Sequence, residues 1–230
     1  MANQKAGRQT GTDLCTRKTW NTKPNWMDER VWKKIRDEGF YHKSDEIMIS
    51  CGTVTLDRAD TTTPKVLVVH NSIIGVFLLP KGRKNIGEDY LAAALRETAE
   101  ETGIAVRPLQ LRFGTRATPA GTDGSALEDT KSGITGALNN EAIGINPDPA
   151  KGAWRNIHWY AAKPRDEVGR DKHGMPKRDE TLMPPEDRVK FQTHWYTEEE
   201  ALSKLKMENE RFMVRVAFEH IRRMSPDDWS

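Results

Sequence analysis

Short apolar runs separated by polar residues dominate the middle of the chain and predict a sheet. The runs at 46–56, 65–70 and 75–80 are rich in Val, Ile and Leu and are bounded by Asp, Thr, Asn and Ser, as strands usually are. The run at 65–70 is almost continuously apolar, which is typical of a central strand covered on both faces. Further runs of this character predict strands at 104–113, 156–163 and 190–196.

Helical patterns lie between and after these strands. The segment 88–103 predicts a helix that is closed by a glycine at its C-terminal end. Thr197 and Glu200 form a capping box, which predicts the start of a second helix. Residues 208–223 predict a closing helix, whose apolar positions include Phe212, Val216 and Ile221. Strands followed by helices in this way predict an α/β fold in which helices pack on a sheet.

Charge and glycine content divide the chain into segments. Residues 1–24 are polar and mostly basic, which predicts a flexible arm. Residues 25–44 predict a helical extension, because acidic residues precede basic ones as the helix dipole favours. The main domain is expected at 45–224, followed by a short tail at 225–230. Residues 114–153 hold seven glycines and few bulky side chains, so they are expected to form an insertion without regular structure.

Composition excludes several classes of protein. The chain has 36 Lys and Arg residues against 34 Asp and Glu, a formal net charge of +2, so a nucleic acid is not the expected partner. No stretch approaches the roughly 20 consecutive apolar residues of a membrane-spanning helix. The first residues lack the apolar core of a secretory signal, which predicts a cytoplasmic or nuclear location. Cys15 and Cys51 lie far apart and predict neither a disulfide framework nor a zinc site.

Three glutamates give the helix at 88–103 an unfavourable charge pattern. Glu97, Glu100 and Glu101 stand at i, i+3 and i+4, which places three repelling carboxylates on one side of the helix. Two of them also lie in the last turn, where the helix dipole disfavours anions by about 0.3–1 kcal/mol each. A divalent cation reverses both effects, because Mg²⁺ and Mn²⁺ prefer oxygen ligands. The cluster therefore predicts a Mg²⁺ or Mn²⁺ site.

The residues around this cluster resemble a known family signature. Gly82 is followed after five residues by Glu88 and, after seven more, by the segment RETAEETGI at 96–104. This spacing resembles the Nudix box, GX5EX7REUXEEXGU, in which U is a bulky apolar residue. Thr98 departs from it, since the family prefers Ile, Leu or Val there, and slightly looser packing of the helix on the sheet is expected.

The resemblance implies a Nudix fold, an α/β/α sandwich with a mixed central sheet, and metal-dependent hydrolysis of a diphosphate linked to another group. It implies that Glu97 and Glu101 bind the metal and that Glu100 is a metal ligand or the base that deprotonates the attacking water. Arg96 would orient these glutamates through charge-assisted hydrogen bonds. The backbone carbonyl of Lys81 is implied as a further metal ligand.

Three other positions of the box are implied to be structural. Gly82 lets the loop backbone approach the helix. Glu88 lies nine residues before Glu97 and so about half a turn out of phase at 100° per residue, which predicts that it supports the loop rather than binds the same ion. Gly103 ends the helix.

A basic loop entering the box points to the substrate. Lys81, Arg83 and Lys84 supply three cations within four positions, and Arg112 and Arg116 follow the helix as possible additions. The PKGR-type entry resembles the Nudix branch that cleaves diphosphoinositol polyphosphates and diadenosine polyphosphates. The expected partner is therefore a polyphosphorylated small molecule, bound at a local basic mouth on a balanced surface.

Other functions stay open at this point. ADP-ribose or another nucleoside diphosphate compound would need an aromatic platform, for which the candidates are Trp154, Trp159, Phe191 and Tyr196. Cleavage of capped RNA would need a basic track, and only the arm at 1–24 offers one. A module of another class, which binds a phosphorylated ligand without cleaving it, has no evident reason to keep three mutually repelling glutamates.

Overall fold

The computed structural model describes residues 42–58, 63–115, 138–148 and 153–229, together with 27–30, 33 and 37. The chain divides into two compact units, one formed by 42–117 with 134–230 and the other by 1–41 with 118–133. In the smaller unit, Arg30 pairs with Asp28 at 2.6 Å. The predicted arm and most of the predicted N-terminal helix lie outside the described residues.

The larger unit is built on one mixed sheet of eight strands. Its main path runs in the order β10-β2-β1-β9-β5, and β3, β4 and β8 pair with β2, β1 and β9. The central pair β1–β9 is parallel and the other pairs are antiparallel. The strands are β1 (Ile47–Asp57), β2 (Lys65–Asn71), β3 (Val76–Leu78), β4 (Lys81–Arg83), β5 (Val106–Pro108), β8 (Gly144–Asp148), β9 (Trp154–Pro164) and β10 (Phe191–Tyr196).

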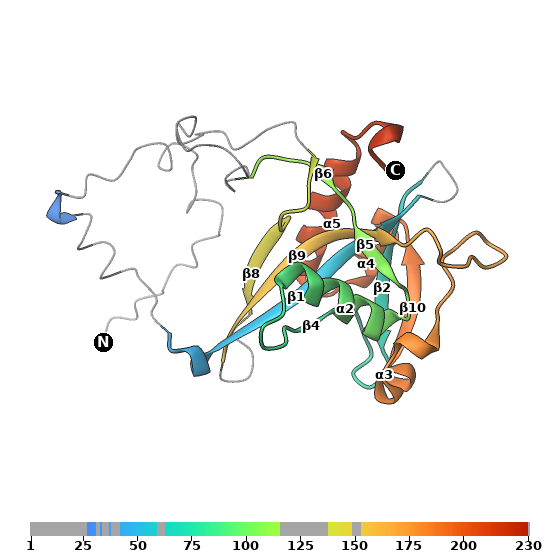
Figure 1. Ribbon diagram of the computed structural model, residues 1–230, viewed down its shortest axis with the longest axis horizontal. Coiled ribbons are helices and arrows are strands. Elements are labelled where there is room, and N and C mark those ends of the chain that lie inside the picture. The colour runs from blue at the N-terminus through green and yellow to red at the C-terminus, as the bar shows by residue number, and fades with distance from the viewer. Residues whose placement is uncertain are drawn as a thin grey trace, which may run out of the picture. The chain divides into compact units, whose positions relative to one another are not determined.

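Helices cover both faces of this sheet, which confirms the predicted sandwich. In Figure 1, α2 lies in front of the sheet and α5 behind it. The helices are α2 (Tyr90–Thr102), α3 (Pro185–Lys190), α4 (Glu198–Lys204) and α5 (Glu208–Ile221), with 3₁₀ turns at Ser44–Glu46, Glu180–Leu182 and Pro226–Trp229. Successive residues of β2 pack on opposite faces of the sheet. Val66 packs with α5, and Leu67 packs with Ile104 and Leu95.

Part of the predicted insertion belongs to the sheet. Residues 138–148 contain β8 and the short strand β7 (Leu138–Asn139), which pairs with β6 (Leu111–Arg112). The amide oxygen of Asn146 on β8 accepts a 2.6 Å hydrogen bond from the indole of the buried Trp159. The sequence did not predict β8 as a strand because it contains glycine and proline, which are tolerated in strands mainly at sheet edges.

The closing helix buries Ile221, as predicted, but not Phe212. Phe212 is 54% exposed, whereas Met213, Val214 and Ala217 are buried. The fully buried carboxylate of Glu210 lies on this same apolar face. The helix therefore buries the charged Glu210 along with Phe218, while Phe212 lies outside the buried face.

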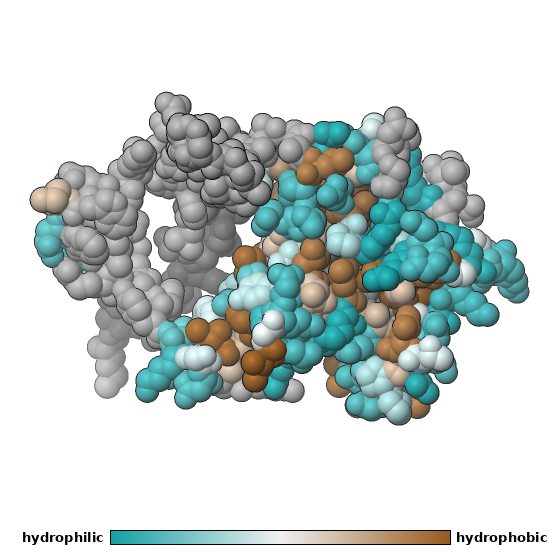
Figure 2. Space-filling view, in the orientation of Figure 1, coloured by the Kyte–Doolittle hydropathy of each residue, from teal (hydrophilic) through white to brown (hydrophobic). Residues whose placement is uncertain are grey.

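The surface has the mixed character that the charge balance predicts. Figure 2 shows mostly hydrophilic residues on one face, interrupted by hydrophobic patches. Among the described residues, the most exposed large apolar side chain is Ile86, in the loop before α2. In the described part of the chain, no helix is both long and apolar enough to span a membrane.

Candidate active site

The helix α2 has well-defined ends that fix its position. Asp89 caps its start by accepting hydrogen bonds from the amides of Leu91 and Ala92. Gly103 ends it in the left-handed conformation, with φ of 70°, and donates its amide to the carbonyl of Ala99. The predicted stop at Gly103 thus has a direct backbone reason.

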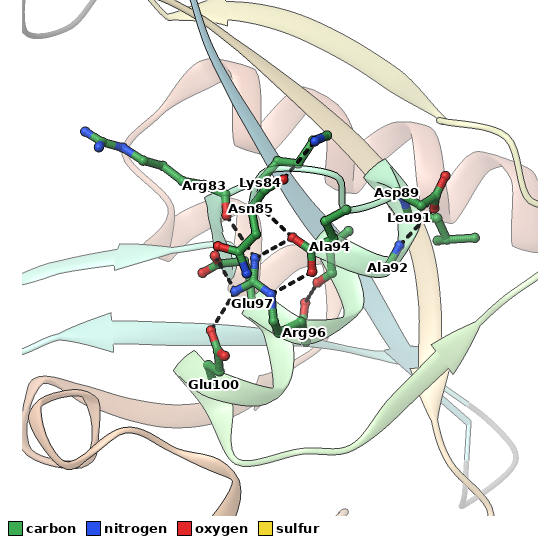
Figure 3. A network of polar contacts seen from close by, with 12 residues as sticks. Arg83, Lys84, Asn85, Asp89, Leu91, Ala92, Ala94, Arg96, Glu97 and Glu100 are labelled. Carbon is green, nitrogen blue, oxygen red and sulfur yellow. Dashed lines mark hydrogen bonds and ion pairs between the residues drawn. The ribbon is translucent and has the colours of Figure 1, made fainter.

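Arg96 lies at the centre of the glutamate cluster (Figure 3). One guanidinium nitrogen, Nη1, donates to Glu97 at 2.7 Å and to Glu100 at 2.8 Å. The Nε and Nη2 atoms form a fork on the carboxylate of Glu88, at 2.8 and 2.9 Å. A single arginine therefore orients three carboxylates, as expected of a planar guanidinium with several fixed donors.

Glu88 connects this cluster to the loop that precedes it. Its Oε2 accepts a 2.8 Å hydrogen bond from the amide of Asn85. The Nη2 atom of Arg96 also donates to the carbonyl of Arg83, so the arginine holds the loop at two points. These contacts agree with the supporting role predicted for Glu88.

The Glu88–Arg96 pair predicts a pH-dependent stability. The hydrogen bonds from Arg96 lower the pKa of Glu88 from 4.5 to about 2. Because the folded-state pKa is depressed, the stabilisation is complete above pH 4.5 and is lost as the pH falls toward about 2. We expect urea unfolding across this window to show a steeper loss of stability in the wild type than in Glu88→Gln. Parallel pH profiles of the two proteins would contradict this assignment.

Gly82 touches the cluster from the strand side. A Cβ atom on Gly82 would lie 1.8 Å from Oε2 of Glu97, so only glycine allows this approach. Since side chains alternate along a strand, Lys81 and Arg83 face away from α2 on either side of Gly82. The predicted close approach at Gly82 therefore has a specific partner, the carboxylate of Glu97.

Substitution of Gly82 tests this contact. The methyl group of Gly82→Ala must displace the Glu97 carboxylate, and we expect kcat to fall by about 10²-fold, the loss that a displacement of about 1 Å can cause. Gly169→Ala is the matched control, because nothing lies within 4 Å of the added Cβ. Steady-state kinetics with a thermal melt distinguish the two effects. Wild-type kcat in Gly82→Ala would show that the position of Glu97 does not matter.

Glu101 is held on the other side of the cluster. Its Oε2 accepts a 3.0 Å hydrogen bond from the backbone amide of Lys81. Burial raises the pKa of Glu101 to about 8, against the lowering effect of Lys81. Burial also raises the pKa of Glu97. Both carboxylates are therefore short of compensating positive charge.

The donor set fits a hard divalent cation. Glu97, Glu100, Glu101 and the Lys81 carbonyl all offer oxygen ligands, and added positive charge would favour the ionised form of the buried carboxylates. Among the described residues, no three acidic, histidine or cysteine side chains are arranged as a ready metal site. Glu97 and Glu100 instead turn toward Arg96. The Mg²⁺ or Mn²⁺ site thus stays a prediction that requires these side chains to reorient.

The predicted basic mouth is only partly assembled. The Lys81 ammonium lies 2.9 Å from Oε1 of the buried Glu210, so it binds substrate only if it leaves that pair. The side chains of Arg83 and Lys84 point away from Arg96 in Figure 3, and the Lys84 ammonium donates to the carbonyl of Asn85.

Of the two arginines that follow the helix in sequence, Arg112 does not add to this mouth. Arg112 pairs with Asp228 at 2.7 Å. Arg116 lies outside the described residues. Among the cations predicted to bind substrate, Arg83 therefore combines an exposed side chain with a backbone contact to the glutamate cluster.

Thr98, the departure from the family pattern, is fully buried and hydrogen bonded. Its hydroxyl lies 2.7 Å from that of Thr53 on β1, which in turn lies 2.7 Å from that of Thr55. The same hydroxyl donates to the carbonyl of Ala94. The helix is thus fixed to the sheet by a chain of hydroxyl groups, so the looser packing predicted at Thr98 is not observed.

The candidate aromatic platforms divide into core and surface residues. Trp159 is fully buried and Phe191 is 2% exposed, so both serve the core. Trp154 stacks on His42 at 5.4 Å. Tyr196 is half-buried and stacks on His194 at 5.6 Å. Of the four candidates, Trp154 and Tyr196 therefore keep some exposed ring surface.

A mixed sheet between helical layers, with an arginine-bridged glutamate cluster on α2, defines a protein of the Nudix fold. The family model of the NUDIX domain matches residues 49–216, and the chain belongs to this family. The sequence therefore identified the family from the residues of one loop and one helix.

Solved structures of low identity are similar to this chain. C. elegans Ap4A hydrolase is 17% identical over 75% of this chain and 97% of that chain, with a TM-score of 0.45. The MutT protein from Methanosarcina mazei Go1 is 14% identical over 77% of this chain and 98% of that chain, also with a TM-score of 0.45. A UDP-X diphosphatase is 9% identical over 83% of this chain and 70% of that chain, with a TM-score of 0.44. No curated protein sequence matches the chain.

Family membership defines the type of chemistry. The chain is a hydrolase of phosphoanhydride bonds, and Nudix hydrolases in general act on small molecules. Nudix hydrolases in general use divalent metal ions. The hydrogen-bonded glutamates on α2 are among the residues of this chain that match the family signature.

Proposed function

We propose that this hydrolase cleaves a phosphoanhydride bond in a highly phosphorylated small molecule, either a diphosphoinositol polyphosphate or a diadenosine polyphosphate. The supporting observation is the placement of Arg83. Its carbonyl accepts a 2.9 Å hydrogen bond from Arg96, while its side chain is exposed to solvent. The backbone of Arg83 is thereby anchored next to the glutamate cluster, and its exposed guanidinium, which faces away from α2 in this structure, would turn toward the phosphates that flank the scissile bond.

The proposal gives each residue of the cluster a task. Glu97, Glu100, Glu101 and the Lys81 carbonyl would hold Mg²⁺ or Mn²⁺, which when bound neutralises diphosphate oxygens and acidifies a coordinated water. Arg96 keeps Glu97 and Glu100 in fixed orientations. Glu100 would accept the proton of the attacking water if it is not itself a metal ligand, because it is the most exposed partner of Arg96 at 33%.

The direct test measures product formation with and without Mg²⁺ or Mn²⁺, as inorganic phosphate from the diphosphoinositol compound and as chromatographically separated nucleotides from the other two substrates. Diphosphoinositol polyphosphate, diadenosine polyphosphate and ADP-ribose are compared on the wild type, on Glu100→Gln and on Arg83→Ala. We expect turnover of a polyphosphorylated compound that disappears in Glu100→Gln and is weakened through KM in Arg83→Ala. Arg165→Ala is a matched control, because the side chain of that arginine is 54% exposed and makes only a 3.7 Å pair with Glu167 and a 3.3 Å hydrogen bond to the carbonyl of Val106.

Other outcomes would redirect the assignment. Turnover of ADP-ribose alone would favour a nucleoside diphosphate substrate, for which the exposed surface of Tyr196 offers a stacking partner. If none of the three compounds is hydrolysed but capped RNA is cleaved, the capped end of an RNA is the favoured substrate. Tight metal-dependent binding of a phosphorylated ligand without any turnover would favour the non-catalytic module.

A further inference from the structure

A buried ion pair connects α5 with the loop that enters the Nudix box. The carboxylate of Glu210 has no exposed surface, and its Oε1 lies 2.9 Å from the ammonium of Lys81, which is 11% exposed. Its Oε2 accepts a 3.1 Å hydrogen bond from the amide of Leu79. The Lys81 ammonium also donates to the carbonyl of Leu79 at 3.4 Å. Glu210 thus fixes both the backbone and a side chain of one three-residue segment.

The same segment carries the contacts of the glutamate cluster. The amide of Lys81 donates to Glu101, and the adjacent Gly82 lies against Glu97. The carbonyl of Pro80 accepts a 3.2 Å hydrogen bond from the amide of Thr53. Residues 79–82 are therefore held by α5 on one face of the sheet and present their other side to the glutamates of α2.

Energetics argue against a purely structural role for the pair. Removing two charges from water costs several kcal/mol per ion, and an apolar pair of similar volume often fills such a space equally well. Glu210, however, holds the segment at two points, the Leu79 amide that donates to its Oε2 and the Lys81 ammonium that lies beside its Oε1. An apolar contact lacks this directional control, because hydrophobic packing is not directional.

We propose that Glu210 is a positioning residue for the hydrolase, acting through Lys81 and the Leu79 amide to align the 79–82 segment with Glu97 and Glu101. The inference rests on the proposed function of these glutamates in metal binding and hydrolysis. It does not depend on which diphosphate is the substrate. Replacing a residue that orients metal ligands without itself binding the metal typically lowers metal affinity or activity by about 10–100-fold.

The experiment uses Glu210→Gln in the full chain. We expect kcat to fall by about 10–100-fold and the Mn²⁺ dissociation constant, measured by electron paramagnetic resonance of free Mn²⁺, to rise by a similar factor. KM for the substrate is expected to change less than kcat, because Glu210 itself has no exposed surface with which to contact substrate.

Two control variants separate positioning from general loosening. Glu208→Gln removes a carboxylate two residues earlier on α5 that is 69% exposed and pairs with Arg215. Val214→Ala removes buried volume one turn further along the same face of α5. Both are expected to keep wild-type Mn²⁺ affinity. If Val214→Ala reproduces the kinetic and metal-binding loss of Glu210→Gln, or if Glu210→Gln behaves like the wild type, the proposal is overturned.

The remaining outcomes also decide the matter. Should Glu210→Gln fail to fold, Glu210→Asp keeps the charge but shortens its reach, and wild-type Mn²⁺ affinity in that variant would overturn the proposal. If the wild type hydrolyses none of the compounds tested, the substrate assignment fails, but the Mn²⁺ comparison between Glu210 variants and controls still tests the positioning role.

Discussion

Replacing Glu100 by glutamine is expected to lower kcat by about 10²–10⁴-fold, the range for loss of a general acid or base. Glutamine has nearly the same shape and keeps an oxygen that can accept the 2.8 Å hydrogen bond from Arg96. It cannot carry the negative charge needed to bind a cation or to take a proton from water. Initial-rate measurements at saturating substrate and metal provide the test.

The fold of Glu100→Gln must be checked alongside its rate. Far-UV circular dichroism and a melting curve are expected to match the wild type, because Glu100 is partly exposed and its fixed partner remains. Glu219→Gln is the matched control, since Glu219 forms an exposed i,i+4 pair with Arg223 on α5. A Glu100→Gln enzyme with wild-type kcat would exclude Glu100 as base and as essential ligand.

Arg96→Lys is expected to affect both activity and stability. Lysine is a point charge and cannot form the fork on Glu88 while also bridging Glu97 and Glu100. We expect kcat/KM to fall by about 10²-fold or more, since misplacement of a catalytic group by about 1 Å can have this effect. Chemical denaturation is expected to show a loss of about 2–3 kcal/mol, less than for a fully buried pair.

The control for this substitution is an arginine in an exposed pair. Arg107 donates to Asp166, which is 83% exposed, and Arg107→Lys is expected to change stability by at most about 1 kcal/mol. An Arg96→Lys variant that keeps activity within about threefold would show that the charge of residue 96, rather than its geometry, is what the site needs.

The elements with strong local signals were predictable from the sequence. Helix α2 has an aspartate cap and a left-handed glycine at its ends, and β2 contains four consecutive apolar residues at 66–69. The residues of the Nudix box lie in one contiguous segment with a fixed spacing. The local sequence was therefore enough to predict that Arg96 lies among the glutamates. These features depend on contacts within a few residues, which a linear pattern records.

Features that depend on distant partners were not predictable in the same way. Lys81 was expected to face the substrate, but its ammonium pairs with Glu210, a residue far along the chain. Thr98 was expected to loosen the helix, but Thr53 on another strand satisfies its hydroxyl. A signal for Glu210 existed: it lies three and four residues before the buried Met213 and Val214, on the apolar face of α5.

The parallel pairing of β1 with β9 constrains how the chain can reach its fold. Ile47 pairs with Trp154 and the ladder continues to Thr55 with Ala162, so the centre of the sheet joins segments far apart in the sequence. Such a topology has a high contact order, and folding is slowed because a long loop must close before the ladder forms. During synthesis, β1 and the whole Nudix box emerge before their central partner. A nascent chain that stops short of β9 therefore exposes an unpaired β1 edge, which makes that interval the period of greatest exposure to aggregation.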